Sequence, residues 1–272
     1  MDVEVRKRIE AIEERMTSID KKLDQILLLK NENPEEEKEI EETKEEETTT
    51  GFTGDPIATK KMIKTIQEKH SHDVGASLDE EELYELADKR LLTFEEFKWI
   101  LESKVYSPAF IGHTVDLKNG DLFLTFKILE VDENGYDLIC LNYEKESEFG
   151  DTNTYKHSFV REIINSEFLQ LLPEEVLTHL QIMEVESNDE VLEDYAKLVS
   201  MTELGKSDEY YSIKKEGERY DLLNSNIFEK YIWTRSRSTD TGSYVWNVYD
   251  NGNVHINTYS ASCTLAPVIR LG

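Results

Sequence analysis

Apolar side chains recur at alternating steps of four and three positions over the first thirty residues. They are Val5, Ile9, Ile12, Met16, Ile19, Leu23 and Ile26. This spacing is the heptad pattern of a coiled coil, with Ile9, Met16 and Leu23 at the a positions and the remainder at d. Because β-branched residues at d disfavour a two-stranded coil, residues 1–30 are predicted to form a trimer or tetramer.

Charged residues beside the heptad seam indicate how the strands run. Arg8 with Glu13 and Arg15 with Asp20 occupy g and the following e positions. Opposite charges at these positions meet between parallel strands, so a parallel coil is favoured. The alternative is a single amphipathic helix that docks on the rest of the chain.

Residues 31–55 are strongly acidic and almost free of apolar side chains. From residue 31 to residue 50 the chain holds ten Glu, two Lys and one Pro. Such a segment buries too little apolar surface to offset the entropy of ordering, so it is predicted to be a disordered linker extended by its own charge. The linker either lets attached heads search a volume or acts as a plain solubilising spacer.

Helical spacing returns over residues 56–104, which are predicted to form a small helical adaptor of two or three helices. Ser77 or Asp79 is expected to cap one helix, and Thr93 with Glu96 forms the capping-box pattern of another. The apolar residues of this region are predicted to form a miniature core of their own: Leu83, Leu86, Leu91, Phe94, Phe97, Trp99 and Leu101.

Strand-like alternation dominates residues 105–272, the predicted head. A hairpin is expected at Asn134 and Gly135, and a second at Asn251 and Gly252. Between them, residues 158–182 show helical spacing interrupted at Pro173, which predicts two helices covering a sheet. The fold class predicted for the head is therefore α+β.

Charge and hydropathy restrict the partners. The chain has 58 acidic and 31 basic residues, a formal net charge of −27, which repels nucleic acid and anionic lipid. No apolar run approaches the roughly 20 residues that span a bilayer, and the N-terminus lacks the layout of a signal peptide. We therefore expect synthesis in the cytoplasm, no membrane insertion and no nucleic-acid partner.

Catalytic and metal-binding patterns are weak. Cys140 and Cys263 lack C-x-x-C spacing and are expected to be reduced core residues. His70 and His72 form an H-x-H pair that can bind a transition metal around a threefold axis, although a solvated loop explains them more simply. No phosphate loop, nucleophile elbow or EF-hand pattern occurs, so neither a catalytic residue nor a cofactor or metal is predicted.

The end of the chain is rich in Tyr, Trp, Asn and Ser, a mixture typical of recognition surfaces. The candidate ligand-binding residues are Arg237, Tyr244, Trp246, Asn247, Tyr249, His255, Asn257 and Tyr259. Alternation directs Tyr244 and Trp246 to one face of a strand and Asn247 and Tyr249 to the other, and one face is expected to be core. The alternative is an ordinary half-buried hairpin with a polar outer face.

Several segments, in order, resemble a family of bacterial and phage domains of unknown function. They are FKIL (126–129), YKHSFVREIINSEF (155–168), KLVSMTEL (197–204), YIWTRS (231–236), GNV (252–254) and APVIRL (266–271). The chain departs from the family pattern at Thr234, where Leu is usual, and at Ala266, where Arg is usual. The resemblance implies a C-type-lectin-like fold over residues 105–272, as in formylglycine-generating enzymes and phage tropism determinants. Arg235, within the tryptophan-arginine-serine block, is expected to form an internal ion pair.

A coiled coil, a linker and a lectin-like head together suggest a non-enzymatic phage virion fibre or adhesin. Several weak heads on one stalk gain avidity for a bacterial surface glycan or protein. Expected partners are further copies of the chain and other virion proteins, and the expected location is the virion. An intracellular bacterial scaffold is the alternative, and an enzyme on the formylglycine-generating fold, using Cys140 or Cys263, is the third hypothesis.

Overall fold

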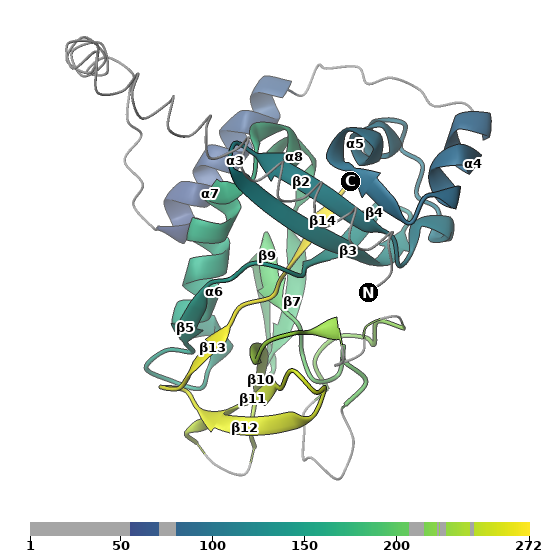
Figure 1. Ribbon diagram of the computed structural model, residues 1–272. Helices are drawn as coiled ribbons and strands as arrows, with labels where there is room; N and C mark the ends of the chain where they lie inside the picture. Colours follow the sequence, from purple (N-terminus) through teal and green to yellow (C-terminus); the bar gives the residue numbers. More distant parts are fainter. Residues whose placement is uncertain (1–54, 71–79, 207–214, 222, 224–226, 240–241) are drawn as a thin grey trace, which may run out of the picture. The chain divides into compact units, whose positions relative to one another are not determined.

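The computed structural model describes residues 55–70, 80–206, 215–221, 223, 227–239 and 242–272 (Figure 1). The predicted coiled coil of residues 1–30, the acidic linker up to residue 54, the helix cap at Ser77 or Asp79 and the side chains of His70 and His72 lie outside these residues. The predictions made for them therefore stay predictions.

The chain enters the described region through helices α3 (Pro56–His70), α4 (Glu80–Asp88) and α5 (Phe94–Glu102). The capping box predicted at the start of α5 is confirmed. Thr93 Oγ1 accepts a hydrogen bond from the Glu96 N–H at 3.3 Å, and the Glu96 carboxylate accepts one from the Thr93 N–H at 2.9 Å. Two of the donors that a helix start leaves unpaired are thereby satisfied.

The prediction of a separate miniature core in the adaptor is wrong. Leu86, Phe97 and Leu101 lie in one hydrophobic cluster with Leu124 and Phe126 of the following sheet. Strand β1 (Leu91–Thr93), just before α5, also pairs in parallel with β2 (Thr114–Asn119). These short helices bury their apolar faces on the sheet because they cannot enclose a core alone.

Not all of the predicted adaptor core is buried. Leu91 and Trp99 are 53% and 44% exposed. Leu91 lies on the outer face of an edge strand, where alternation turns every second side chain to solvent. These two side chains therefore contribute little to the core.

The larger sheet has the strand order β1-β2-β3-β4-β14-β6, and β9 also pairs with β14. Its further strands are β3 (Leu122–Asp132), β4 (Gly135–Cys140), β6 (Leu180–Gln181), β9 (Ala196–Leu198) and β14 (Pro267–Leu271). The predicted hairpin joins β3 to β4 and is confirmed, but its turn lies at Glu133 and Asn134, one residue before the predicted position, because Asp132 pairs with Gly135. Glycine is needed just after this turn, because a Cβ on Gly135 would lie 2.5 Å from the carbonyl oxygen of Leu271.

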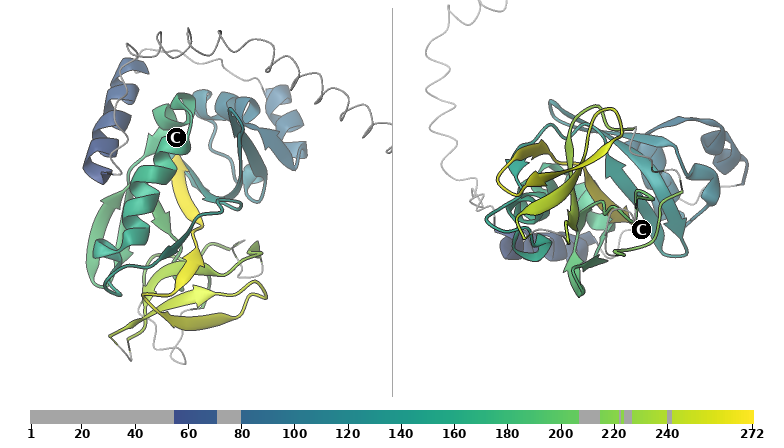
Figure 2. Two further views of the ribbon diagram at one scale, coloured as in Figure 1. Left: turned by 60° about the vertical axis from the view of Figure 1, so that its left-hand side comes forward. Right: turned by 90° about the horizontal axis from the view of Figure 1, so that it is seen from below.

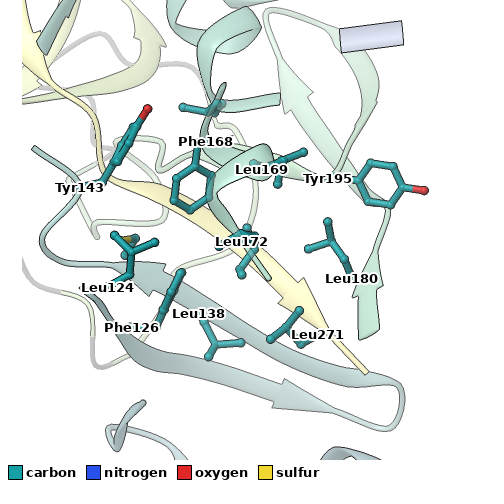
Figure 3. Packing of buried hydrophobic residues seen from close by; sticks show 14 of the residues in the cluster. Leu124, Phe126, Leu138, Tyr143, Phe168, Leu169, Leu172, Leu180, Tyr195 and Leu271 are labelled. Carbon is teal, nitrogen blue, oxygen red and sulfur yellow. The ribbon is translucent and has the colours of Figure 1, made fainter. Parts of the chain in front are cut away.

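A helical column covers this sheet and breaks where the sequence predicts. It comprises η2 (Tyr155–His157), α6 (Phe159–Ile163), the π-helix η3 (Ile164–Phe168), α7 (Leu169–Leu171) and, after Pro173, α8 (Glu174–His179). Figure 3 shows Phe168 and Leu172 on the side of β3 and β4, and the Phe168 ring lies 6.4 Å from the Phe126 ring of β3, centroid to centroid. Helix α3 lies against α8 (Figure 2), where Gln67 donates hydrogen bonds to the carbonyls of Leu177 and Leu180.

The smaller sheet has the strand order β12-β11-β10-β13-β5. Its strands are β5 (Glu146–Glu148), β10 (Ile232–Arg237), β11 (Tyr244–Val248), β12 (Val254–Thr258) and β13 (Ser262–Thr264). The second predicted hairpin, β11–β12, is confirmed, with Gly252 at φ +78° in its turn. Strand β13 leads directly into β14, so the chain passes from the smaller sheet into the larger one (Figure 1).

A separate hairpin of β7 (Met183–Ser187) and β8 (Glu190–Asp194) completes the described strands. The fold is thus mixed α+β, as predicted, with sheets predominating over helices. Within the described part of the chain, no helix combines the length and the apolar character that crossing a bilayer requires.

Candidate ligand-binding site

The smaller sheet is buried on both faces at its centre. Trp233 and Val245 pack into the same core as the larger sheet, whereas Ile232, Trp246 and Val248 pack into a second apolar cluster. The expectation that only one face of β11 is core is therefore corrected. Ligand contact is left to the ends and the edges of this sheet.

Arg235, a residue of β10, lies at the centre of a buried ion cluster. Its side chain is 1% exposed and forms a bidentate pair with Glu203, with Nη1–Oε2 and Nη2–Oε1 distances of 2.6 and 3.0 Å. Lys197 Nζ reaches the same carboxylate at 2.8 Å. The internal ion pair expected for Arg235 is confirmed.

A second carboxylate, Glu216, completes this ion cluster. It accepts hydrogen bonds from Ser236 Oγ at 2.6 Å and from the Asn188 N–H at 3.0 Å. Burial raises the pKa of Glu216, with Arg235 opposing the rise. Burial acts in the same direction on Glu203, but Arg235 and Lys197 outweigh it and lower its pKa to about 2. Every member of the cluster is buried and paired, so it joins segments of the fold and offers no entry to a ligand.

A short row of aromatic rings lies at one end of the sheet. Because Ile232 pairs with Val248, the next residues outward, Tyr231 and Tyr249, lie opposite each other, with ring centroids 4.5 Å apart. The Tyr249 ring stacks on His255 of β12, with centroids 5.2 Å apart and planes 13° apart. Tyr231 is 50% exposed and His255 is also exposed, so the aromatic row Tyr231–Tyr249–His255 belongs to the surface.

A cleft of about 310 Å³ opens beside Tyr231. We call it the Tyr231 cleft, and it is lined by Glu146, Lys230, Tyr231, Asp250, Ser262, Cys263 and Thr264. One aromatic ring, two carboxylates, one ammonium group and two hydroxyls thus converge on a single hollow. A few polar groups around an aromatic wall are typical of small-molecule sites.

The inner wall of the Tyr231 cleft is formed by Cys263, which is almost fully buried. Behind it, Asn247 Nδ2 lies 3.9 Å from Cys263 Sγ. Asn247 Oδ1 is buried and has no hydrogen-bond partner within the part of the chain that the structure describes. Because an unpaired buried carbonyl is costly, this amide marks a polar position behind the cleft that packing alone does not explain.

Neither cysteine is activated for chemistry. Burial raises the pKa of Cys140 to about 12 and that of Cys263 to about 11. The thiolate is the nucleophilic form, so both side chains remain unreactive thiols at neutral pH. Both are free and buried, as the sequence predicts.

We expect both thiols to be protected from a disulfide reagent such as Ellman's reagent in the native protein at pH 8. Two thiols per chain should react only after denaturation, because burial limits both access and ionisation. Absorbance of the released thiolate measures both rates. Rapid titration of either thiol in the native protein would contradict this assignment.

A larger hollow of about 470 Å³ lies elsewhere, against the start of α3 and the start of α6. Its cations are already engaged. Arg161 donates to both carboxylate oxygens of Asp194 at 2.7 and 2.8 Å, and Lys156 pairs with Glu190 at 3.1 Å. A charged ligand would have to displace these pairs, so the Tyr231 cleft is the better candidate site.

The predicted contact residues divide into three groups. Tyr249 and His255 belong to the aromatic row, and the Asn257 side chain reaches Cys263 behind the cleft. Trp246 and Asn247 are 8% and 0% exposed, which corrects their assignment as surface contacts. Arg237, Tyr244 and Tyr259 lie toward the other end of the β11–β12 hairpin, because Tyr244 pairs with Thr258 and Arg237 with Val245.

Sequence reasoning missed most of the cleft lining. The sequence contains a signal for Tyr231. It precedes Trp233 by two residues, so strand alternation places both side chains on the same face. Glu146 carries no such signal, because β5 reaches β13 only through tertiary pairing, Cys263 with Ser147. In the described ranges no cluster of three or more His, Cys, Asp or Glu side chains is placed to hold a metal ion.

Comparison with known proteins identifies the family but no individual relative. No curated protein and no solved structure matches the chain significantly. Residues 119–271, more than half of the chain, match the family described as domain of unknown function DUF6273. The match contains the whole smaller sheet, the Arg235 ion cluster and the Tyr231 cleft. The chain therefore belongs to the DUF6273 family.

Proposed function

We propose that this chain is a non-enzymatic glycan-binding protein that holds a sugar ring in the Tyr231 cleft. The observation that carries the proposal is an exposed tyrosine beside two carboxylates in one hollow. The C–H face of a sugar ring packs on an aromatic face, while carboxylates accept hydrogen bonds from its hydroxyls. Glu146 and Asp250 supply those acceptors, and Ser262 and Thr264 supply hydroxyls.

The size of the site favours a small saccharide over a protein surface. A stable protein interface buries about 800 Å² on each partner. The Tyr231 cleft is a local hollow of about 310 Å³ in which polar groups stand among apolar surface. Ligand hydroxyls that bind here can replace the water around the carboxylates and keep their hydrogen bonds satisfied.

For the whole chain, we propose a C-type-lectin-like head displayed in several copies on a parallel coiled coil, as in a phage fibre or an adhesin. Support comes from the order of the motif segments at 126–271 and from the heptads at residues 1–30. A single open cleft binds weakly, and display on one stalk raises the avidity for a repetitive bacterial surface polymer.

Binding of the full chain to immobilised bacterial polysaccharides and to immobilised protein extracts tests this function. We expect retention on at least one polysaccharide, with release by the soluble saccharide of the same composition. Retention on proteins alone, insensitive to every saccharide, would overturn the proposal in favour of a protein-binding scaffold. Presence of the chain in purified phage particles tests the virion setting separately.

A further inference from the structure

A second, smaller hollow adjoins the Tyr231 cleft. It has a volume of about 80 Å³, and its apolar walls are Leu141, Tyr143, Phe228, Ile232, Leu265 and Ala266. Lys230 and Thr264 line both hollows, so the two are neighbours. We call the smaller one the Leu141 hollow. A cleft with an aromatic wall and polar groups thus lies next to the largely apolar Leu141 hollow.

The Leu141 hollow has the size of a small substituent. At about 30 Å³ per water molecule, its volume corresponds to two or three waters, enough for an acetyl group but not for a second sugar ring. The apolar walls favour a methyl group over a hydroxyl, which would lose its hydrogen bonds to water there.

Tyr143 is one of the residues that line the Leu141 hollow. Its ring packs against Phe168 with centroids 5.0 Å apart. Burial raises the pKa of Tyr143, so the hydroxyl keeps its proton at neutral pH and can donate to a carbonyl oxygen. An amide carbonyl next to a methyl group fits this combination of walls.

Charge selects against an acidic ligand. Glu146 and Asp250 line the cleft and Glu144 lines the Leu141 hollow, whereas Lys230, which lines both, already pairs with Glu144 at 2.8 Å. A carboxylate or sulfate on the sugar would face these acids without a free cation among the lining residues. A saccharide with an acidic group is therefore disfavoured.

We propose that the site recognises a neutral acetamido sugar, with its ring on Tyr231 in the cleft and its acetyl group in the Leu141 hollow. This inference rests on the proposed glycan-binding function and names its ligand class. The acetamido group supplies the methyl for the apolar walls and the carbonyl for the Tyr143 hydroxyl. The sugar hydroxyls remain for Glu146 and Asp250.

Saturation-transfer NMR titrations of the full chain test the inference with four probes: N-acetylglucosamine, N-acetylgalactosamine, glucose and galactose. At least one acetamido sugar should bind about tenfold more tightly than its parent hexose. Burial of the one or two carbons of the acetyl group is expected to produce a difference of this size. Leu141→Trp should fill the hollow and remove that preference while the hexose still binds. Leu141 is 37% exposed, so the part of the larger ring that does not fit the hollow can lie in solvent and the fold should tolerate the substitution.

Leu91→Trp is the matched control, because Leu91 is an exposed leucine on β1, at the edge of the larger sheet. It should leave both affinities unchanged. Equal affinity for acetamido and parent sugars, or an acetamido preference that survives Leu141→Trp, would overturn the inference and leave glycan binding intact. Binding of none of the four probes, together with no retention on any polysaccharide, would overturn the proposed function as well.

Discussion

Replacing Glu203 with glutamine is expected to lower the free energy of unfolding by about 3–5 kcal/mol at neutral pH. The carboxylate is buried with Arg235 and Lys197, and the amide would leave two buried cations facing one remaining carboxylate, Glu216. The neutral amide also cannot accept the bidentate pair that the guanidinium donates. Urea unfolding followed by tryptophan fluorescence measures the loss.

The pH dependence separates the ion pair from simple repacking. The pKa of Glu203 in the folded protein is lowered to about 2, against roughly 4.3 when unfolded. A carboxyl of this kind stabilises the fold above its unfolded-state pKa and loses that contribution as the pH falls toward 2. The difference in stability between wild type and Glu203→Gln should therefore shrink between pH 5 and pH 3.

A matched control is Glu167→Gln, which removes a pair with Lys145 at 2.7 Å between half-exposed side chains. Solvent screens this pair, so the variant should lose less than about 1 kcal/mol. Equal losses for the two variants, or a loss at Glu203 that does not change with pH, would contradict the role assigned to the ion cluster.

Tyr231→Ala is expected to weaken saccharide binding by at least about thirtyfold, which corresponds to roughly 2 kcal/mol, the loss typical of a central aromatic contact. Tyr231 forms both the wall of the cleft and the end of the aromatic row. Its removal takes away the ring on which the sugar packs. Titration calorimetry with the saccharide that the wild-type chain retains measures the change.

The fold should survive this substitution because half of the Tyr231 side chain is already exposed. Tyr231→Phe keeps the ring and should retain most of the affinity. Tyr84→Ala, which removes an exposed tyrosine on α4, is the matched control and should bind as wild type does. Unchanged affinity of Tyr231→Ala, with binding intact in the control, would remove the Tyr231 cleft as the ligand site.

Local patterns in the sequence predicted much of the fold. Asn251 with Gly252 specifies a hairpin turn through backbone conformation, because Gly252 has a φ of +78°, so the position of this turn follows from residue type. Pro173 ends one helical stretch because it cannot donate the next hydrogen bond, and Thr93 begins another because its hydroxyl caps the first turn. These features depend on a few adjacent residues.

Only the tertiary structure decided which surfaces remain open. The sequence directs Trp246 and Asn247 to opposite faces of β11, but both are buried because separate apolar clusters cover the two faces. The helices before β2 pack on the sheet instead of forming their own core, since nine residues in α4 or α5 bury too little surface alone.

The candidate site likewise combines residues placed by local sequence with residues placed only by tertiary pairing. The sequence by itself determined the hairpin that brings Tyr249 and His255 together, because register follows from the turn. Glu146 and Cys263 reach the cleft through pairing of β5 with β13, more than a hundred residues apart, and no local pattern encodes that contact. Nearby residues set turns and periodicity, whereas the choice among distant partners is made when the whole core is buried.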